Sequence, residues 1–322
     1  MLPRRLALAG LAGVVGAQSA RATSFPQRLV RILVPVPAGS VPDILARLIA
    51  ERAASEWGFP VVVENRPGAG GAIGVEAGVR SPSDGHTLLL GSSGPIAILP
   101  AVNRRLSYHP LRDLLPIARV ADFPLVVLAS RDSGLRSFAE FLARARSTAD
   151  TLDYAGGDIG STQHLAGALL AVRAGLRLNH VPYRGGGLAQ ADLIAGRIPV
   201  MVDSLSAVLR TIQDAKATPL AVCGLRRSAQ LSEVPTVQEA GVPDYEATGW
   251  MGLFVPAATP FDIVAALTAA LMPVLTEPAL ASRVAAIGSD ATVQDGLVFT
   301  RFVADELTKW KRLAEVAGIM LD

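Results

Sequence analysis

The hydrophobic positions of this chain alternate between short apolar runs and longer stretches with helical spacing. In the first third of the chain, strands and helices are predicted in the order 29–34, 43–56, 61–63, 72–80 and 87–90, beginning with a strand. Short apolar runs are typical of buried strands, whereas apolar residues three or four positions apart indicate helices. The alternating order predicts a mostly parallel sheet with helices on both of its faces.

A second alternating series begins near residue 125. It predicts strands at 125–128, 152–154, 179–181, 198–202 and 219–223, with helices at 137–145, 162–174 and 188–195. Residues 232–248 are rich in Pro, Glu and Gly and have no periodicity, so we interpret them as a connection between lobes. A strand at 250–255 and helices up to the C-terminus follow, with the apolar face of the last helix expected in the core.

The length of 322 residues is sufficient for two medium α/β domains, each with its own core. The C-terminal segment has no core of its own, so we expect it to return to the first lobe. The predicted division is lobe 1 over 23–124 plus 243–322 and lobe 2 over 125–242. Because the chain then crosses twice between the lobes, a cleft is expected between them.

The first 22 residues have the pattern of a secretory signal peptide. Arg4 and Arg5 precede an uncharged stretch at 6–17, and residues 20–22 fit a small-x-small cleavage site. A membrane anchor needs about 18 or more apolar residues, and this apolar stretch is shorter. We expect cleavage near Ala22 and export to the periplasm, and the paired arginines leave twin-arginine and general secretion as alternatives.

Composition and charge exclude several classes of function. Half of the chain is apolar and 18% is charged, as in packed globular proteins. The predicted leader contains three arginines and no acid, so its removal changes the formal net charge from +2 to −1. A nucleic-acid partner, which requires a basic face, is therefore not expected. The one cysteine, Cys223, excludes an intrachain disulfide and is expected to be a buried, unreactive thiol.

Several apolar runs end in glycine and hydroxyl residues directly before a predicted helix. These strand-to-helix turns lie at residues 34–43, 91–95, 160–164, 181–187 and 201–204. Helix N-termini present free backbone N–H groups and the positive end of the helix dipole, which favour an anion. Several such turns around one cleft predict a receptor for a small carboxylate.

The turn before the first helix carries the clearest pattern. The small residues Ala38, Gly39 and Ser40 allow a ligand to approach the backbone closely. Ser40 and Asp43 also match a capping box, and a cap alone would explain both residues. Direct contact between Asp43 and the ligand is not expected, because its carboxylate would repel an anion.

The sequence contains few motifs that indicate catalysis, a metal site or a cofactor. Residues 64–74 lack the G-x-G-x-x-G spacing of a dinucleotide loop, so we interpret them as a structural turn. His164 has no metal-ligand partners at suitable spacing, which favours a hydrogen-bonding role. Tyr183 and Arg184 are candidates for hydrogen bonds to an anion, with a solvated surface arginine as the alternative. We expect no catalytic residue, no metal, no cofactor and no enzymatic activity.

The sequence resembles the Bug family, the periplasmic solute-binding subunits of tripartite tricarboxylate transporters. The matching segments, in family order, are VPVPAGSVPD (34–43), VVVENRPGAGG (61–71), DGHTLLLGSS (84–93), GSTQHLAG (160–167), HVPYRG (180–185) and EVPTVQEAG (233–241). The resemblance implies an α/β fold of the type II periplasmic binding protein class, with two Rossmann-like lobes and an interlobe cleft. It also implies capture of a small carboxylate by backbone N–H groups, hydroxyls and waters.

The turns and the resemblance together predict a ligand-binding set. Its members are Pro37, Ala38, Gly39, Ser40, Ser92, Ser93, Ser161, Thr162, His164, Tyr183, Gly185 and Asp203. One departure from the family affects this set: Ser40, Val41 and Pro42 stand where members usually carry glycines and then Ser or Thr. Pro42 removes an N–H donor and Val41 adds bulk, which predicts a narrower pocket or a different acid.

The expected partners follow from the resemblance. We expect a monomer that binds an organic acid, a dicarboxylate or an amino acid and delivers it to the membrane permease subunits of a tripartite tricarboxylate-type transporter. Two alternatives stay open at this point. One is an extracytoplasmic partner of a sensor kinase, and the other is an exported enzyme on the same scaffold.

Overall fold

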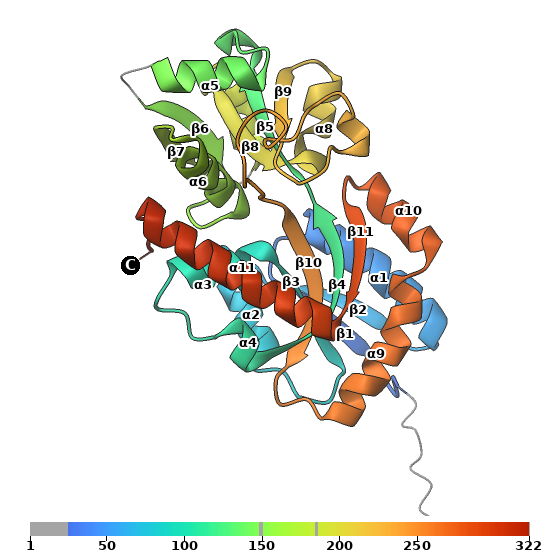
Figure 1. The fold of residues 1–322 in the computed structure, drawn as a ribbon. Coiled ribbons are helices and arrows are strands. Elements are labelled where there is room, and N and C mark those ends of the chain that lie inside the picture. The colour runs from blue at the N-terminus through green and yellow to red at the C-terminus, as the bar shows by residue number, and fades with distance from the viewer. Residues whose placement is uncertain (1–24, 148–150, 184–185, 322) are drawn as a thin grey trace, which may run out of the picture.

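The computed structural model describes residues 25–147, 151–183 and 186–321. The predicted leader at 1–22 lies outside the described residues. Two α/β lobes, each built on its own sheet, lie one above the other in Figure 1. The predicted fold class is confirmed, whereas the exact lobe boundaries at 124, 125, 242 and 243 stay a prediction.

The six-stranded sheet of the first lobe is mixed. Its strand order is β11-β4-β10-β3-β1-β2. The bounds are β1 Val30–Val34, β2 Val61–Asn65, β3 Thr87–Ser92, β4 Leu114–Phe123, β10 Gly249–Pro256 and β11 Asp290–Asp295. Strands β1, β2 and β3 pair in parallel, but β10 runs antiparallel to β3 and β4, and β11 runs antiparallel to β4. The prediction of a mostly parallel sheet therefore holds for β1, β2 and β3 but is wrong for the half of the sheet that contains β10, β4 and β11.

Helices cover both faces of the first sheet, as predicted. The helices are α1 Val41–Trp57, α2 Ala72–Val79, α3 Leu99–Val102, α4 Pro110–Asp113, α9 Phe261–Leu275, α10 Pro278–Ala286 and α11 Gly296–Ala317. Alternate residues of a strand point to opposite faces. Accordingly, Ile32 packs in a core with α1, α9 and α10, whereas Leu33 packs in the core that contains α2, α3 and α11.

The second lobe has a five-stranded sheet with the order β7-β6-β8-β5-β9. Its strands are β5 Leu125–Ser130, β6 Leu152–Gly156, β7 Leu178–Pro182, β8 Val200–Ser204 and β9 Ala217–Val222. Its helices are α5 Phe138–Ser147, α6 Thr162–Ala174, α7 Gly186–Ile194 and α8 Leu205–Gln213. Strand β6 pairs in parallel with β7 and β8, while β5 runs antiparallel to β8 and β9. Helix α6 has the predicted bounds, and α8 follows the predicted turn at 201–204, although no bounds were predicted for it.

One of the hydrophobic clusters of the protein spans both lobes. Leu89 of the first sheet and Val127 of the second belong to the same buried cluster, to which α6 and α11 both contribute. The chain passes from β4 to β5 at Pro124 and returns through the segment between β9 and β10. At this crossing Phe123 pairs with Gly249, and a Cβ on Gly249 would lie 1.9 Å from the Phe123 ring.

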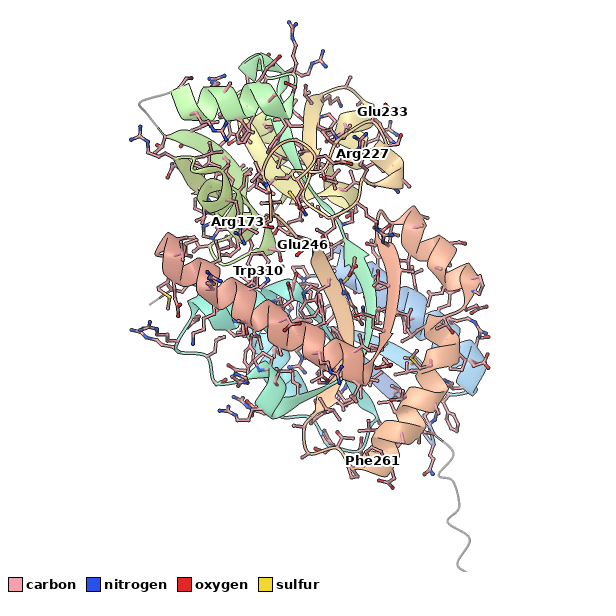
Figure 2. All side chains as sticks on the ribbon, viewed as in Figure 1. Arg173, Arg227, Glu233, Glu246, Phe261 and Trp310 are labelled. Atoms are coloured by element: carbon pink, nitrogen blue, oxygen red, sulfur yellow. The ribbon has the colours of Figure 1, made fainter. Side chains whose placement is uncertain are left out.

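Helix α11 holds the returning segment by a buried polar network. Lys309 forms an ion pair with Glu246 at 2.7 Å and another with Glu306. The indole N–H groups of Trp250 and Trp310 both donate to Glu306 Oε2 at 2.9 Å. Figure 2 shows Glu246 and Trp310 where α11 passes the junction of the two lobes. This network fixes one of the two crossings between the lobes.

Two apolar segments, one around Cys223 and the other in α9, contribute to the core. Cys223 is fully buried, and burial raises the pKa of its thiol to about 12, which confirms the buried site. In the described part of the chain no single helix is long and apolar enough to cross a membrane. Helices α9 and α10 together meet that test by length and composition but bend by 67°. In α9, Leu267 and Leu271 are fully buried in the core.

We predict that Gly249→Ala destabilises the fold by about 1–3 kcal/mol, because the added methyl must displace the Phe123 ring from a packed position. Chemical denaturation measures this change in the free energy of unfolding. The matched control is Gly187→Ala in α7, where a Cβ meets nothing within 4 Å and a neutral or slightly stabilising effect is expected. Equal stability of the Gly249→Ala variant and the wild type would contradict the packing described here.

Candidate ligand-binding site

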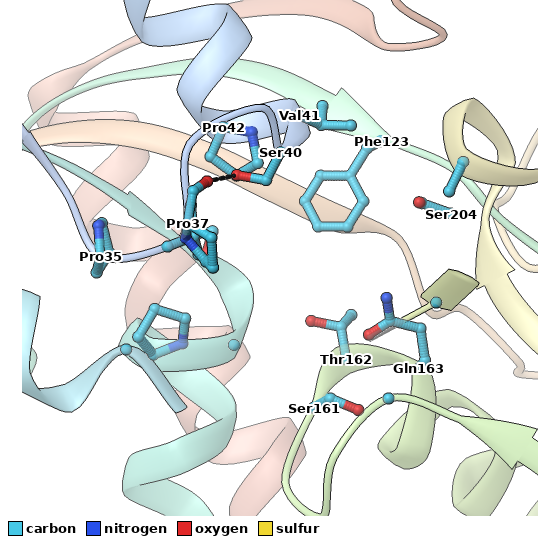
Figure 3. A pocket seen from close by; sticks show the side chains of 18 of the residues that line it. Pro35, Pro37, Ser40, Val41, Pro42, Phe123, Ser161, Thr162, Gln163 and Ser204 are labelled. Carbon is cyan, nitrogen blue, oxygen red and sulfur yellow. Dashed lines mark hydrogen bonds between the residues drawn. The ribbon is translucent and has the colours of Figure 1, made fainter. Parts of the chain in front are cut away.

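A cavity of about 870 Å³ lies between the two lobes. In the first lobe its walls come from the turns after β1, β2 and β3, and in the second lobe from residues 157–163 after β6 and from the start of α8. The rest of the lining is Phe123 at the crossing, Leu99 of α3, Gly186 at the start of α7 and residues 286–288 at the end of α10. Ligand sites of open α/β sheets lie at such carboxyl ends of strands. The structure thus brings the predicted strand-to-helix turns together around one cavity (Figure 3).

Helix N-termini rather than cationic side chains give the cavity its electrostatic character. Helices α1, α6 and α8 begin at the cavity, and so does the short π-helical turn Gly94–Ile98. Their first N–H groups have no acceptor within the helix and carry the positive end of the dipole. Asp158 is the only ionisable side chain among the described residues that line the cavity. An anion here would be held by N–H and O–H donors.

A buried carboxylate organises the turn before α1. Asp43 is 2% exposed, and its Oδ2 accepts the N–H of Gly39 at 2.8 Å, where the backbone has a φ of 81°. Arg47 donates to both carboxylate oxygens, at 3.1 and 2.9 Å, and Asn65 donates to Oδ1 at 2.9 Å. Burial opposes ionisation of Asp43, but these hydrogen bonds outweigh it and lower the pKa of the carboxyl. Asp43 does not line the cavity, and its hydrogen bonds hold the turn that does.

The predicted capping box has different bonds from those expected. Ser40 is the N-cap residue of α1, but its hydroxyl donates to the carbonyl of Pro37 at 2.7 Å and makes no cap hydrogen bond. Asp43 binds the N–H of Gly39 instead of that of Ser40. Hydrogen bonds within the turn itself therefore hold its backbone in place.

The start of α6 forms the opposite wall. Ser161 caps this helix by accepting the N–H of His164 at 3.2 Å. The hydroxyls of Thr162 and Ser93 lie 3.1 Å apart and form a hydrogen bond between the two lobes. Gln163 donates its side-chain amide to Asp203 at 3.2 Å.

The structure places only part of the predicted ligand-binding set at the cavity. The residues that line it are Pro37, Gly39, Ser40, Ser92, Ser161 and Thr162. The predicted residues that do not line it are Ala38, Ser93, His164, Tyr183 and Asp203. Gly185 lies outside the described residues. Contact between any of these residues and a ligand stays a prediction.

The polar residues next to the lining form hydrogen bonds with their neighbours. His164 accepts the N–H of Gly160 at 3.1 Å and stacks on His180, and burial together with His180 lowers the pKa of His164 to about 3. The hydroxyl of Tyr183 donates to Asp192 at 2.8 Å. Asp203 is 4% exposed and accepts the N–H of Ser204 at 2.7 Å, and burial raises the pKa of its carboxyl.

Several lining residues were not predicted. Gly70 and Gly71 belong to the segment that we interpreted only as a structural turn, although it follows a strand and leads into a helix as the other turns do. That shared position was the signal that could have found them. Phe123 and Gly288 follow no such rule, because they reach the cavity from the crossing between the lobes and from the end of α10. Among the described residues no group of three or more His, Cys, Asp or Glu could hold a metal ion.

We predict that Asp43→Asn lowers stability at pH 7 by about 1–3 kcal/mol, since it removes the charge from a buried acceptor with four hydrogen bonds. The folded-state pKa is depressed, so this contribution is complete above the ordinary aspartate pKa of about 4 and is lost as the pH falls further. Urea unfolding of both proteins from pH 7 to pH 3 measures the difference. The exposed pair partner Glu56→Gln serves as control, with an effect below about 0.5 kcal/mol. A pH-independent difference for Asp43→Asn would contradict this assignment.

Known proteins share this architecture. The family model described as tripartite tricarboxylate transporter family receptor matches residues 45–319. The UPF0065 protein in the tcbD-tcbE intergenic region of Pseudomonas sp. strain P51 is 36% identical over 314 residues, which are 96% of this chain and 93% of the relative.

Two solved structures show the same likeness in three dimensions. The structure of R. palustris Rpa4515 with adipate is 32% identical with a TM-score of 0.83, over 92% of this chain and 99% of that one. The structure of the periplasmic binding protein BugD is 30% identical with a TM-score of 0.80, over the same shares of the two chains. The chain therefore belongs to the tripartite tricarboxylate transporter receptor family, the periplasmic solute-binding proteins of the Bug type that its motifs resemble.

Proposed function

We propose that this protein captures a small carboxylate between its two lobes in the periplasm and delivers it to the permease subunits of a tripartite tricarboxylate-type transporter. The observation that carries the proposal is the interlobe cavity, which is lined by helix N-termini and hydroxyl groups of both lobes. Membership in a family of solute-binding receptors supports it, as does the adipate in the Rpa4515 structure. The export signal at 1–22 is part of the same proposal.

Capture begins at the N-terminus of α6. Because Ser161 Oγ accepts the N–H of His164, its own hydroxyl proton is available for an acceptor in the cavity. The N–H groups of Thr162 and Gln163 belong to the first turn of α6 and have no helical acceptor. A ligand carboxylate on this turn would meet several donors and a favourable dipole.

The first lobe contributes the remaining polar contacts. Ser92 lies at the end of β3 and Gly94 opens the π-helical turn directly after it, and both line the cavity. Ordered waters complete such a site at little cost compared with direct hydrogen bonds. Since the lining comes from both lobes, a ligand that contacts both favours the closed arrangement, which is the form that a permease would recognise.

An acid-binding role without catalysis agrees with the arrangement of the titratable groups. Asp43 is paired with Arg47 and Asn65, and Tyr183 with Asp192, and neither Asp43 nor Tyr183 lines the cavity. Among the described lining residues the one carboxylate, Asp158, has no histidine, cysteine or lysine beside it in the lining to form a catalytic pair. We therefore propose a receptor and not an enzyme.

We predict that the chain from residue 23 onward binds small organic acids in isothermal titration calorimetry, and that Ser161→Ala weakens this binding about tenfold by removing one hydrogen bond to a charged group. The probes are acetate, succinate, hexanoate, adipate, citrate and glutamate. Ser282→Ala, an exposed helical serine of α10 that bonds only its own helix, is the control and should leave binding unchanged. A correctly folded protein that binds none of the probes would contradict the proposal.

A further inference from the structure

One wall of the cavity offers few hydrogen-bond donors. Pro35, Pro37 and Pro42 line it, and none of them has a backbone N–H group. The N–H of Gly39, in the same wall, is already donated to Asp43. The hydroxyl of Ser40 is donated to the carbonyl of Pro37. The turn before α1 therefore uses these polar groups internally, and the N–H of Val41 in the first helical turn is left as a donor.

The same side of the cavity is apolar. Val41 and Phe123 lie next to each other in Figure 3, across the cavity from Ser161, Thr162 and Gln163. Leu209 of α8 and Ile287 after α10 add aliphatic surface to the lining. The Phe123 ring packs closely on the backbone of Gly249, where a Cβ would lie 1.9 Å from the ring.

The start of α8, with Ser204 and Ser206, also lines the cavity, but a larger group of donors lies in the opposite wall. It comprises the start of α6 with Ser161 and Thr162, and Ser92 with the π-helical turn after β3. A single carboxylate can be satisfied here. A second carboxylate on the same molecule would have to lie on the side of Val41 and Phe123, where Ser204 and Ser206 supply the lining hydroxyls and the apolar side chains make desolvation of a charge costly.

From this asymmetry we infer that the ligand is a monocarboxylate with an apolar chain or ring, whose carboxylate lies at the start of α6 and whose apolar part lies against Val41 and Phe123. The inference rests on the proposed function and specifies its ligand class. It also differs from what the Rpa4515 structure contains, because adipate carries a carboxylate at each end.

The test compares hexanoate with adipate, two acids with the same carbon chain that differ in the second carboxylate. Calorimetric titration of the chain from residue 23 onward should show hexanoate binding at least about tenfold more tightly. In the series butanoate, pentanoate and hexanoate, each added methylene should improve the affinity about three- to fourfold as it enters the apolar wall.

Two variants locate the effect in the wall. Val41→Ser should weaken hexanoate binding about three- to tenfold and leave acetate binding unchanged, because it removes apolar contact area and not a donor. Val62→Ser, at an exposed position of β2 outside the cavity lining, is the matched control and should change neither. Thermal unfolding confirms that both variants fold.

The outcomes separate this inference from the proposed function. Adipate binding as tightly as hexanoate or more tightly, or affinities that do not rise along the series, would overturn the inference and leave carboxylate capture in place. A folded protein that binds none of these acids would overturn both.

Discussion

The proposed function depends on one electrostatic constraint: among the described residues, no cationic side chain lines the cavity that we propose as an anion site. The donors in the lining are backbone N–H groups and hydroxyls at the ends of strands. Such donors bind an anion strongly only when the backbone holds them in a fixed orientation. A mobile turn would satisfy its own N–H groups or bind water. The buried contacts behind the cavity meet this constraint, with Asp43 holding the turn before α1 and His164 holding the turn before α6.

The same constraint explains why the site lies between two lobes. A single sheet edge offers the strand ends of one lobe, whereas two facing edges surround a ligand with turns from several helices. The two crossings of the chain hold these edges in a fixed position relative to each other. Phe123 packs on Gly249 at the crossing, and the network of Glu306 and Lys309 fixes the returning segment on α11. The hydrogen bond between Ser93 and Thr162 then joins the two walls directly.

The sequence analysis predicted the elements whose pattern is local. Helix α6 has the expected bounds because Ser161 caps it and Gly175 ends it in a left-handed conformation. Strand β4 was missed because Arg119 and Asp122 interrupt its apolar pattern, although both are largely buried in an ion pair with each other. Strand β11 was missed because none of its residues is fully buried. The mixed character of the first sheet follows from these two strands and the returning β10.

For the site, the rule that strand ends lead into helix N-termini found six of the lining residues and overlooked Gly70 and Gly71. It could not show which side chains turn away from the cavity, since that depends on tertiary partners such as Asp192 for Tyr183. It also could not find Phe123, which reaches the lining only because the chain crosses there. The closed hydrogen bonding of the Ser40 turn is likewise a property of the folded backbone.

The measurement that tests the central claim most directly is an amide NMR titration of the protein with a carboxylate that binds it. Capture by backbone donors predicts large, saturable downfield shifts of the Thr162 and Gln163 amide protons, with arginine side-chain signals unchanged. Saturable binding that leaves both amides unmoved and shifts an arginine guanidinium instead would contradict it.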